Sequence, residues 1–406
     1  MVVAGCAPSQ SSSDTSKDAG TVPDKIVIGS TLPLTGAESK TGGRYKQGYE
    51  LAFDEVNAAG GLDVNGKKVK VELKLLDDTS DQAKAVNLAQ RLITSDKVNA
   101  FLGTYSTSLV EAQSTVAEQN KIPYVNGGGA ATSIYTKGYK WIFGTLAPVE
   151  NLATNEMEWI DQQQKAGKLP KPAKVAIVWE NTSHGKDFRK GIQDFAKKTG
   201  SYQVVVDESF ALDGTDFSAV LNKVEAAKAD LFMVDAHLPD FITMHRQYLS
   251  SGMCNKIETY GARGTEADAK KALGQKGVDY ILSAVWWNKQ LGDKGLNKKF
   301  VDSFTAKYGT APEWYQAVSY EAARSLFTAI TNAKSVDKTK VRDALSSLKM
   351  DSILPGGKLS FPAAKGGQAS YPFVVQQNLP DGSSPIVYPD NVATGTGTAP
   401  NPGCKG

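Results

Sequence analysis

The sequence predicts an α/β protein of two similar domains with parallel sheets. Short apolar runs typical of strands alternate with stretches whose apolar residues recur every three or four positions, as in helices. This alternation is typical of parallel sheets covered by helices on both faces. The pattern begins twice, near Ile26 and near Val175. A second start indicates a second domain, and we expect a ligand to bind between the two.

The first domain is predicted from apolar runs separated by helical patterns. Its long first helix ends at a pair of glycines, Gly60 and Gly61, and Asn65-Gly66 then turns the chain into the next strand. We expect strands at 25–30, 69–76, 100–102, 123–125 and 141–144, and helices at 45–56, 83–93 and from 109 onward.

The second domain repeats this order after a stretch with two prolines at 168–172. We expect strands at 174–179, 202–206, 229–234, 257–260 and 280–285, and helices at 186–198, 217–227 and 241–250. Further helices are predicted at 297–307, 315–333 and 341–348, followed by short strands at 358–361 and 371–377.

Two consecutive loops of the first domain predict a ligand site. Residues 103–108 and 126–133 are small or polar, and each follows a buried strand. Backbone N–H groups at the start of the following helix point outward there, and the helix dipole adds partial positive charge, so such a loop can bind an anion. Either loop alone could be an ordinary turn, but the two together favour a site.

The composition excludes several classes of protein. The chain has 406 residues, of which 41% are hydrophobic and 22% charged, and this is enough for two globular domains. The net charge of +3 favours neither a nucleic acid nor a strongly acidic partner. No apolar run approaches the ~20 residues of a membrane-spanning helix.

No enzyme motif is present in the sequence. Residues 61–68 nearly match a phosphate-binding loop, but Lys68 stands where Ser or Thr must bind magnesium, and the segment precedes a strand. There is no Gly-x-Ser-x-Gly, no Cys/His pair has zinc-site spacing, and histidines number only 3. We therefore expect no catalytic residue, no metal and no cofactor.

Residues 1–23 predict a lipid-anchored tether. Residues 3–6, Val-Ala-Gly-Cys, resemble the end of a bacterial lipoprotein signal, and we expect the sequence to begin inside that signal. Cleavage would leave Cys6 to carry the lipids, and the Ser-rich stretch that follows suits a flexible tether. A chance cysteine after small residues is the alternative. The interpretation places the protein outside the cytoplasmic membrane, anchored to it by lipid alone.

The two other cysteines, Cys254 and Cys404, make an even number. In an oxidising compartment this favours one disulfide, which would attach the C-terminal end to the second domain. Two free thiols are the alternative.

The chain resembles the type I periplasmic-binding-protein fold in its leucine/isoleucine/valine-binding branch, whose members are substrate-binding proteins of ABC importers. The resemblance runs from Asp24 to about Gln377. It rests on five segments that are moderately specific singly but occur together in the order typical of the family: 29–36, 57–61, 77–79, 103–108 and 318–323. It implies two Rossmann-like lobes joined by three crossovers, which we place at 145–148, 285–288 and 352–356. The predicted lobes are 24–146 plus 287–353, and 147–286 plus 354–406.

The resemblance also implies a set of site residues. The family binds an amino acid's carboxylate with the two loops described above, which carry Ser106, Thr107, Ser108, Gly128, Gly129 and Ala130. Relatives usually have Thr near Ala130, where the nearest hydroxyls here belong to Thr132 and Ser133.

The opposite lobe of the family supplies two aromatic residues, from the loops that hold His184 and His237 here, and an acidic residue for the ligand ammonium. Arg263 stands in the loop of that acidic residue, and an arginine favours a second anionic or polar group. Either histidine could instead be a surface or capping residue, and Arg263 could pair with Asp235 or Glu266.

Aromatic residues beside these loops are further candidates. Trp286 and Trp287 follow a predicted strand at a crossover, and we expect one in the core and one on the pocket wall. Tyr105 could be a stacking wall or plain packing.

The predicted function is that of an extracytoplasmic, monomeric receptor that captures a small carboxylate-bearing solute and delivers it to an ABC permease by hinge closure. The arginine, histidines and tryptophans favour an aromatic or other organic acid. One alternative is a branched-chain or other amino acid. Another is a sensory domain of the same fold, which would need a transmembrane or signalling segment.

Overall fold

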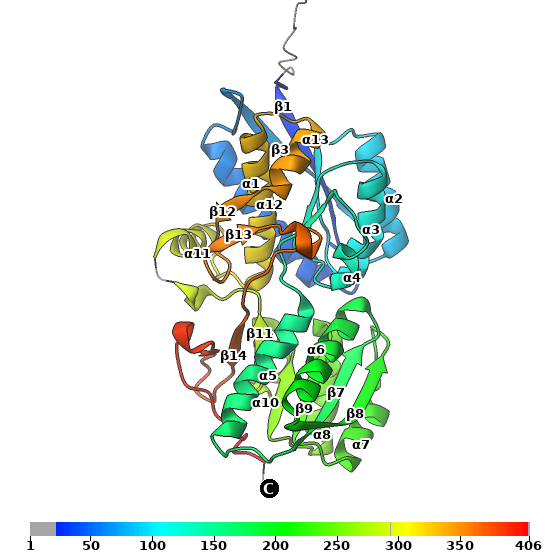
Figure 1. Cartoon of the computed structure of the whole chain (residues 1–406), viewed down its shortest axis with the longest axis vertical. Helices are drawn as coiled ribbons and strands as arrows, with labels where there is room; N and C mark the ends of the chain where they lie inside the picture. The colour runs from blue at the N-terminus through cyan, green and yellow to red at the C-terminus, as the bar shows by residue number, and fades with distance from the viewer. Residues whose placement is uncertain (1–21, 293, 405–406) are drawn as a thin grey trace, which may run out of the picture.

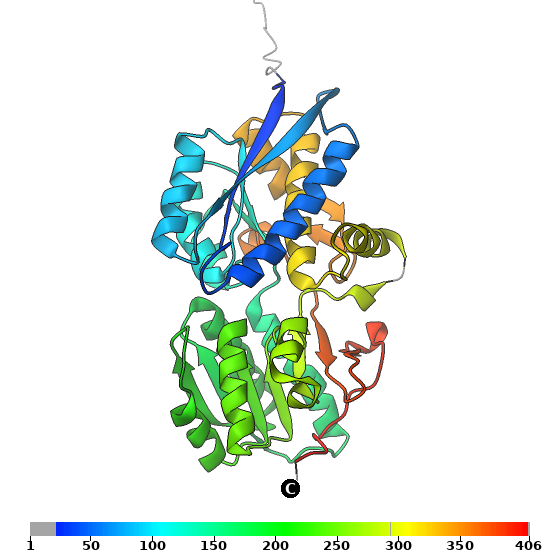
Figure 2. The same cartoon turned by 180° about the vertical axis from the view of Figure 1, so that it is seen from behind.

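Two large β-sheets, each covered by helices, divide the chain into two lobes (Figure 1), and a two-stranded sheet, β12-β13, adds to the first lobe. The computed structural model describes residues 22–292 and 294–404. Cys6 and nearly all of the predicted tether therefore lie outside the described residues. The first lobe is the upper one in Figure 1 and the second lobe the lower one, and the view from behind in Figure 2 shows the same separation.

The first lobe contains a six-stranded sheet in the order β2-β3-β1-β4-β5-β6. Its strands are β1 (Lys25–Leu32), β2 (Leu62–Val64), β3 (Lys67–Asp77), β4 (Ala100–Leu102), β5 (Tyr124–Asn126) and β6 (Ile142–Gly144). The helices that accompany them are α1 (Ser39–Ala58), α2 (Gln82–Thr94), α3 (Thr107–Gln119) and α4 (Thr132–Tyr135). Later segments complete the lobe: α11 (Gly295–Tyr308), α12 (Trp314–Ala333), α13 (Lys338–Ser346), β12 (Lys349–Asp351), β13 (Lys358–Ser360) and the 3₁₀ turn η2 (Ala363–Lys365).

The second lobe contains a seven-stranded sheet in the order β15-β14-β11-β10-β9-β7-β8. Its strands are β7 (Ala173–Glu180), β8 (Tyr202–Phe210), β9 (Leu231–Asp235), β10 (Ile257–Tyr260), β11 (Leu282–Val285), β14 (Val374–Gln377) and β15 (Ile386–Tyr388). Its helices are α5 (Val149–Lys165), α6 (Ser183–Thr199), α7 (Ser218–Ala226), α8 (Leu238–Ser251), α9 (Ala267–Leu273) and α10 (Gln275–Val278). Two short 3₁₀ turns, η1 (Lys289–Leu291) and η3 (Asp390–Val392), follow β11 and β15.

The predicted α/β fold of two lobes is confirmed, but the sheets are not wholly parallel. β2 pairs antiparallel with β3, and β14 and β15 join the edge of the second sheet in antiparallel pairing. Several elements have no counterpart among the predicted ones: the long helix α5 and the short elements β2, α4, α9, α10, β12 and β15. The sequence does carry a helical pattern for α5, because its buried apolar residues recur every three or four positions: Val149, Leu152, Ala153, Met157 and Ile160.

The chain passes between the lobes at 145–148, where β6 ends and α5 begins, and again between β11 and α11. The predicted third crossover at 352–356 is wrong. That segment is the turn of the β12–β13 hairpin, and Gly356 and Gly357 there have φ angles of 85° and 70°. The chain then stays with the first lobe as far as Gln368, which pairs with Gly144. Residues 354–368 thus belong to the first lobe.

Cys254 and Cys404 form a disulfide with Cα atoms 5.3 Å apart. A backbone hydrogen bond from Asn401 N to Lys256 O, 2.8 Å long, holds the same two segments together. The C-terminal end is thereby attached beside the strand β10 of the second lobe.

We expect unfolded, unreduced protein carrying Cys6→Ser to show no reactive thiol, and two after reduction. Because the disulfide restricts the unfolded chain, reduction should lower the free energy of unfolding by about 2–4 kcal/mol. Thiol titration and urea unfolding measure the two effects. Two reactive thiols before reduction would contradict the disulfide.

Glu156 of α5 is a buried carboxyl that joins the helix to the second sheet. Its Oε1 accepts a hydrogen bond of 2.9 Å from Ala284 N, while Oε2 has no partner among the described residues. Burial raises the pKa of Glu156 to about 8. The carboxyl is therefore protonated in the folded protein at neutral pH.

Glu156→Gln should change how stability depends on pH. The unfolded carboxyl loses its proton near the ordinary glutamate pKa of 4.5, and the folded one only near 8. Wild type therefore loses stability from this group as pH rises from 5 to 8, by about 1.4 kcal/mol for each unit by which the two pKa values differ. Over this pH range, the free energy of unfolding measured with urea should therefore rise for the variant relative to wild type. Glu225→Gln, an exposed carboxylate in the same lobe, serves as control; a pH-independent difference for Glu156→Gln would refute the assignment.

Candidate functional site

The first wall of the cleft between the lobes is made by the loop after β4. Thr31 and Thr104 each donate from Oγ1 to Asp78 Oδ2, at 2.8 and 2.7 Å, which fixes the start of this loop. Helix α3 begins at Thr107 directly behind it, with Ser106 at its N-cap. Tyr105 therefore lies buried at the cleft, beside the positive end of the α3 dipole.

The loop after β5 packs tightly against this first loop. A Cβ on Gly128 would lie 2.1 Å from Thr104 O, so only glycine permits the approach. Gly129 N donates to Asn126 Oδ1 at 3.0 Å, and Ala130 N donates to Thr107 Oγ1 at 3.3 Å. Two of the backbone donors predicted for a ligand are thus engaged within the protein.

The second lobe contributes two buried histidines, each paired with carboxylates. His184, in the first turn of α6, places Nδ1 2.7 Å from Asp235 Oδ2. His237, the N-cap of α8, places Nδ1 3.0 Å from Glu38 Oε1 and Nε2 3.7 Å from Glu180 Oε1. Burial alone lowers the pKa of His237, but the negative charges of Glu180 and Glu38 outweigh it and raise that pKa to about 10.

Arg263 follows β10 and reaches across to the first lobe. Its Nη2 donates to the Tyr105 hydroxyl at 2.9 Å. Its guanidinium carbon lies 5.2 Å from the ring centre of Trp314 and 5.6 Å from that of Tyr315. The Nε atom of this buried side chain has no hydrogen-bond partner among the described residues, but it lies 3.9 Å from Glu266 Oε1, one of the two carboxylates that the sequence offered as its partner.

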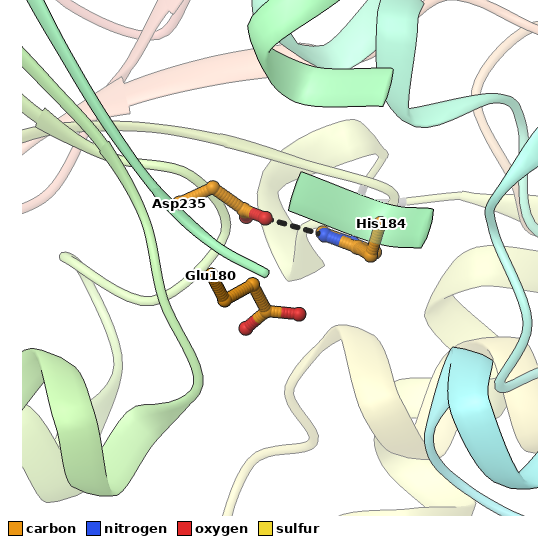
Figure 3. A group of neighbouring side chains, drawn as sticks. All are labelled: Glu180, His184 and Asp235. Carbon is orange, nitrogen blue, oxygen red and sulfur yellow. Dashed lines mark hydrogen bonds and ion pairs between the residues drawn. The ribbon is translucent and has the colours of Figure 1, made fainter. Parts of the chain in front are cut away.

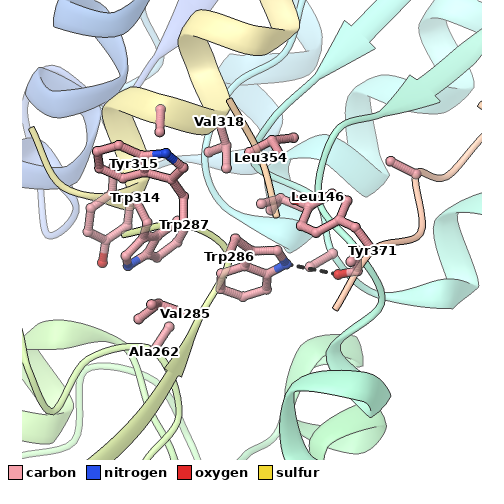
Figure 4. Packing of buried hydrophobic residues seen from close by; sticks show 14 of the residues in the cluster. Leu146, Ala262, Val285, Trp286, Trp287, Trp314, Tyr315, Val318, Leu354 and Tyr371 are labelled. Carbon is pink, nitrogen blue, oxygen red and sulfur yellow. Dashed lines mark hydrogen bonds between the residues drawn. The ribbon is translucent and has the colours of Figure 1, made fainter. Parts of the chain in front are cut away.

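Trp286 and Trp314 form an aromatic wall beside these groups (Figure 4). Their ring centres lie 4.7 Å apart, and Trp286 Nε1 donates to Ala147 O at 2.9 Å. Trp286 follows β11 in the second lobe, whereas Trp314 begins α12 in the first. The aromatic contact therefore spans the cleft.

These groups enclose a cavity of about 10 Å³, large enough for about one water molecule. It is lined by Tyr105, Ser106, Thr107, Gly128, Ala130, Leu146, His184, His237, Arg263, Trp286 and Trp314. The structure is thus a closed form, and a solute larger than water would enter only when the lobes separate.

Three predicted site residues lie away from the cavity. Ser108 is in the first turn of α3 and Gly129 packs against Val110 and Ile134. Trp287 packs against Phe300, with ring centres 5.4 Å apart, and its Nε1 donates to Asn297 Oδ1. The cavity instead includes Leu146 and Trp314, which sequence reasoning missed. Leu146 could have been found because it lies in the predicted first crossover, but nothing in the sequence distinguishes Trp314 from other core aromatics.

Ion pairs beyond the cavity also join the lobes. Arg44 of α1 lies 2.9 Å from Glu266 and 3.0 Å from Asp268, both of the second lobe. It also lies 3.0 Å from Glu313 of the first lobe. Burial raises the pKa of Glu266 to about 7, against the opposing effect of Arg44 and Arg263. Closure therefore depends on positive charge opposite Glu266.

Arg44→Met should shift the protein toward an open form at pH 8, where Glu266 is ionised. Removing one partner of a buried ion pair costs about 3–5 kcal/mol, and opening the lobes recovers part of it by returning Glu266 to water. Small-angle X-ray scattering should show a larger radius of gyration than wild type. Lys46→Met, on an exposed pair of the same helix, is the control. An unchanged radius for Arg44→Met would show that this cluster does not hold the lobes together.

Residues 25–383 match the family model described as periplasmic binding protein. The chain belongs to the periplasmic binding protein family. A Leu/Ile/Val-binding protein homolog of Brucella abortus is 28% identical over 375 residues, which cover 91% of each chain.

Solved structures with lower sequence identity share the fold. A leucine binding protein from Thermotoga maritima superposes with a TM-score of 0.77 at 22% identity, covering 89% of this chain and 97% of that one. A solute binding protein of an ABC transporter from R. palustris, in complex with benzoate, has a TM-score of 0.75 at 21% identity, covering 89% and 94%.

This periplasmic binding protein is therefore an extracytoplasmic solute-binding component of the ABC transporter type, and not an enzyme. Within residues 22–292 and 294–404, we find no helix with the length and apolarity needed to cross a bilayer.

Proposed function

We propose that this protein binds an aromatic or other organic acid in the cleft, in preference to leucine or valine, and delivers it to an ABC permease. The observation that carries the proposal is the charge of the cavity wall. Arg263, His184 and His237 line the cavity, and none of its lining residues within the described chain is a carboxylate. A solute with negative charge fits this wall.

The carboxylates near the cavity are already paired within the protein. Glu38 faces His237, and Asp235 faces His184. Glu266 accepts from the Tyr315 hydroxyl and faces Arg44. An amino acid's ammonium would have to break one of these pairs or remain without an anionic partner, and a desolvated, unpaired charge is costly.

An organic acid meets matching groups in the same place. Its carboxylate can take the place of the Tyr105 hydroxyl beside Arg263, whose Nε already has an unused donor among the described residues. An aromatic ring can stack on Trp286 or Trp314. The benzoate complex of the R. palustris protein shows that such a ligand is compatible with this fold.

The proposed cycle uses the two lobes as a hinge. The solute binds while the lobes are apart, the charged groups described above close over it, and the permease recognises the closed form. We further propose that the protein acts as a monomer and that lipid on Cys6, outside the described residues, anchors it to the cell membrane.

Titration calorimetry should show tighter binding of benzoate or 3,4-dihydroxybenzoate than of leucine or valine. Arg263→Met should weaken the aromatic acids about 10- to 100-fold, because a hydrogen bond to a charged group contributes about 1.5–3 kcal/mol. Arg246→Met removes an exposed arginine of the same lobe and should leave the affinity unchanged. Tight binding of leucine with none of the aromatic acids would disprove the ligand class.

A further inference from the structure

Three buried side chains of the second lobe, Glu180, His184 and Asp235, meet beside the cleft (Figure 3). One potential ligand atom from each lies within 4.8 Å of the other two. Glu180 ends β7, Asp235 ends the neighbouring strand β9, and His184 lies in the first turn of α6. Because all three stand on regular elements of one lobe, their arrangement does not depend on closure of the cleft.

The carboxylate of Glu180 lacks a partner for one of its oxygens. Oε1 accepts from Thr182 Oγ1 at 2.8 Å, but Oε2 has no hydrogen-bond partner among the described residues. The side chain is only 1% exposed. A buried carboxylate oxygen without a partner is energetically costly, and a bound cation would remove that cost.

The imidazoles near the cluster are fewer than the carboxylates that they face. The imidazole of His237 lies 3.7 Å from Glu180, but it also lies 3.0 Å from Glu38. Asp235 has the imidazole of His184 beside it at 2.7 Å. In the closed cleft three carboxylates, one from the first lobe (Glu38) and two from the second (Glu180 and Asp235), thus share two imidazoles. The guanidinium of Arg263 pairs instead with Glu266, at 3.9 Å.

We propose that Glu180, His184 and Asp235 bind one divalent transition-metal ion, of which Zn²⁺ is the best probe. One imidazole nitrogen and two carboxylate oxygens suit zinc, whereas calcium and magnesium prefer a larger set of oxygen ligands. The ion would replace the hydrogen bond between His184 and Asp235. The sequence predicted no metal, because these three ligands lack the spacing of a zinc motif and meet only in the fold.

Three protein ligands leave a coordination position open. His184 lines the cavity, so the ion would lie next to the space where a solute binds. Water would fill the open position in the absence of solute. If the proposed function holds, a solute carboxylate oxygen could replace that water, and zinc would strengthen solute binding.

Equilibrium dialysis against Zn²⁺ tests the metal site directly, without any organic solute. The protein should carry no polyhistidine tag, and Cys6→Ser should be present throughout, since a thiolate is itself a zinc ligand. We expect one Zn²⁺ per chain and a zinc-dependent rise in melting temperature. His184→Ala and Glu180→Gln should each weaken zinc binding at least tenfold.

Glu156→Gln is the matched control, because it removes a buried carboxyl of the same lobe that lies outside the cluster. It should keep the zinc affinity of wild type. Circular dichroism and thermal melting of each variant without zinc would show whether the fold is retained. If wild type binds no zinc, or if His184→Ala and Glu180→Gln bind it as wild type does, the site does not exist.

The two proposals fail independently. Zinc binding measured without solute says nothing about the solute, so its absence would leave the organic-acid proposal standing. Conversely, a protein that binds zinc at these residues but no aromatic acid would refute only the proposed ligand class.

Discussion

Arg263 is the group on which the closed cleft depends. It belongs to the second lobe, yet its hydrogen bond to Tyr105 and its contacts with the Trp314 and Tyr315 rings are all made with the first. A buried guanidinium must be hydrogen-bonded and charge-compensated. Glu266 of its own lobe lies 3.9 Å from its Nε, but the hydrogen bond and the aromatic faces come from the opposite lobe. The Glu38–His237 pair imposes the same condition a short distance away. Charge pairing therefore determines how the lobes are oriented in the closed form. The aromatic contacts between the lobes increase the buried surface of that form.

The sequence predicted those parts of the site that are formed by residues close together in the chain. Loops 103–108 and 126–133 follow short apolar strands, and a loop of small residues between a strand and a helix is typical of an anion-binding site. His184, His237 and Arg263 could be placed because each follows a strand of the second domain. Glu38, Glu180 and Asp235 were not predicted as site residues, because a carboxylate at a strand end or before a helix is common. The fold of the second lobe brings Glu180 and Asp235 to the histidines, and closure of the cleft adds Glu38.

One open choice and one error have equally physical causes. Trp286 and Trp287 are adjacent at the end of β11, where successive side chains point to opposite sides. The sequence indicates that one faces the cleft, but the choice depends on which of the two packs against Phe300 of α11, and that contact is made only in the fold. The turn at Gly356 and Gly357 has the composition of a crossover as well as of a hairpin. Pairing of β12 with β13 decides between them, and the apolar pattern of such three-residue strands is too short to predict it.

The disulfide has a topological consequence. Between Cys254 and Cys404 the chain leaves the second lobe, builds α11 to β13 of the first, and returns. The covalent ring closed by the two sulfurs therefore passes through both lobes and includes two of the three connections between them. A protease that cuts once in either connection would nick the chain without releasing a fragment. These two connections of the hinge are thus protected twice against cleavage outside the cell, by the disulfide and by the burial of residues such as Trp286 and Ala369, whereas the connection at 145–148 lies outside the ring.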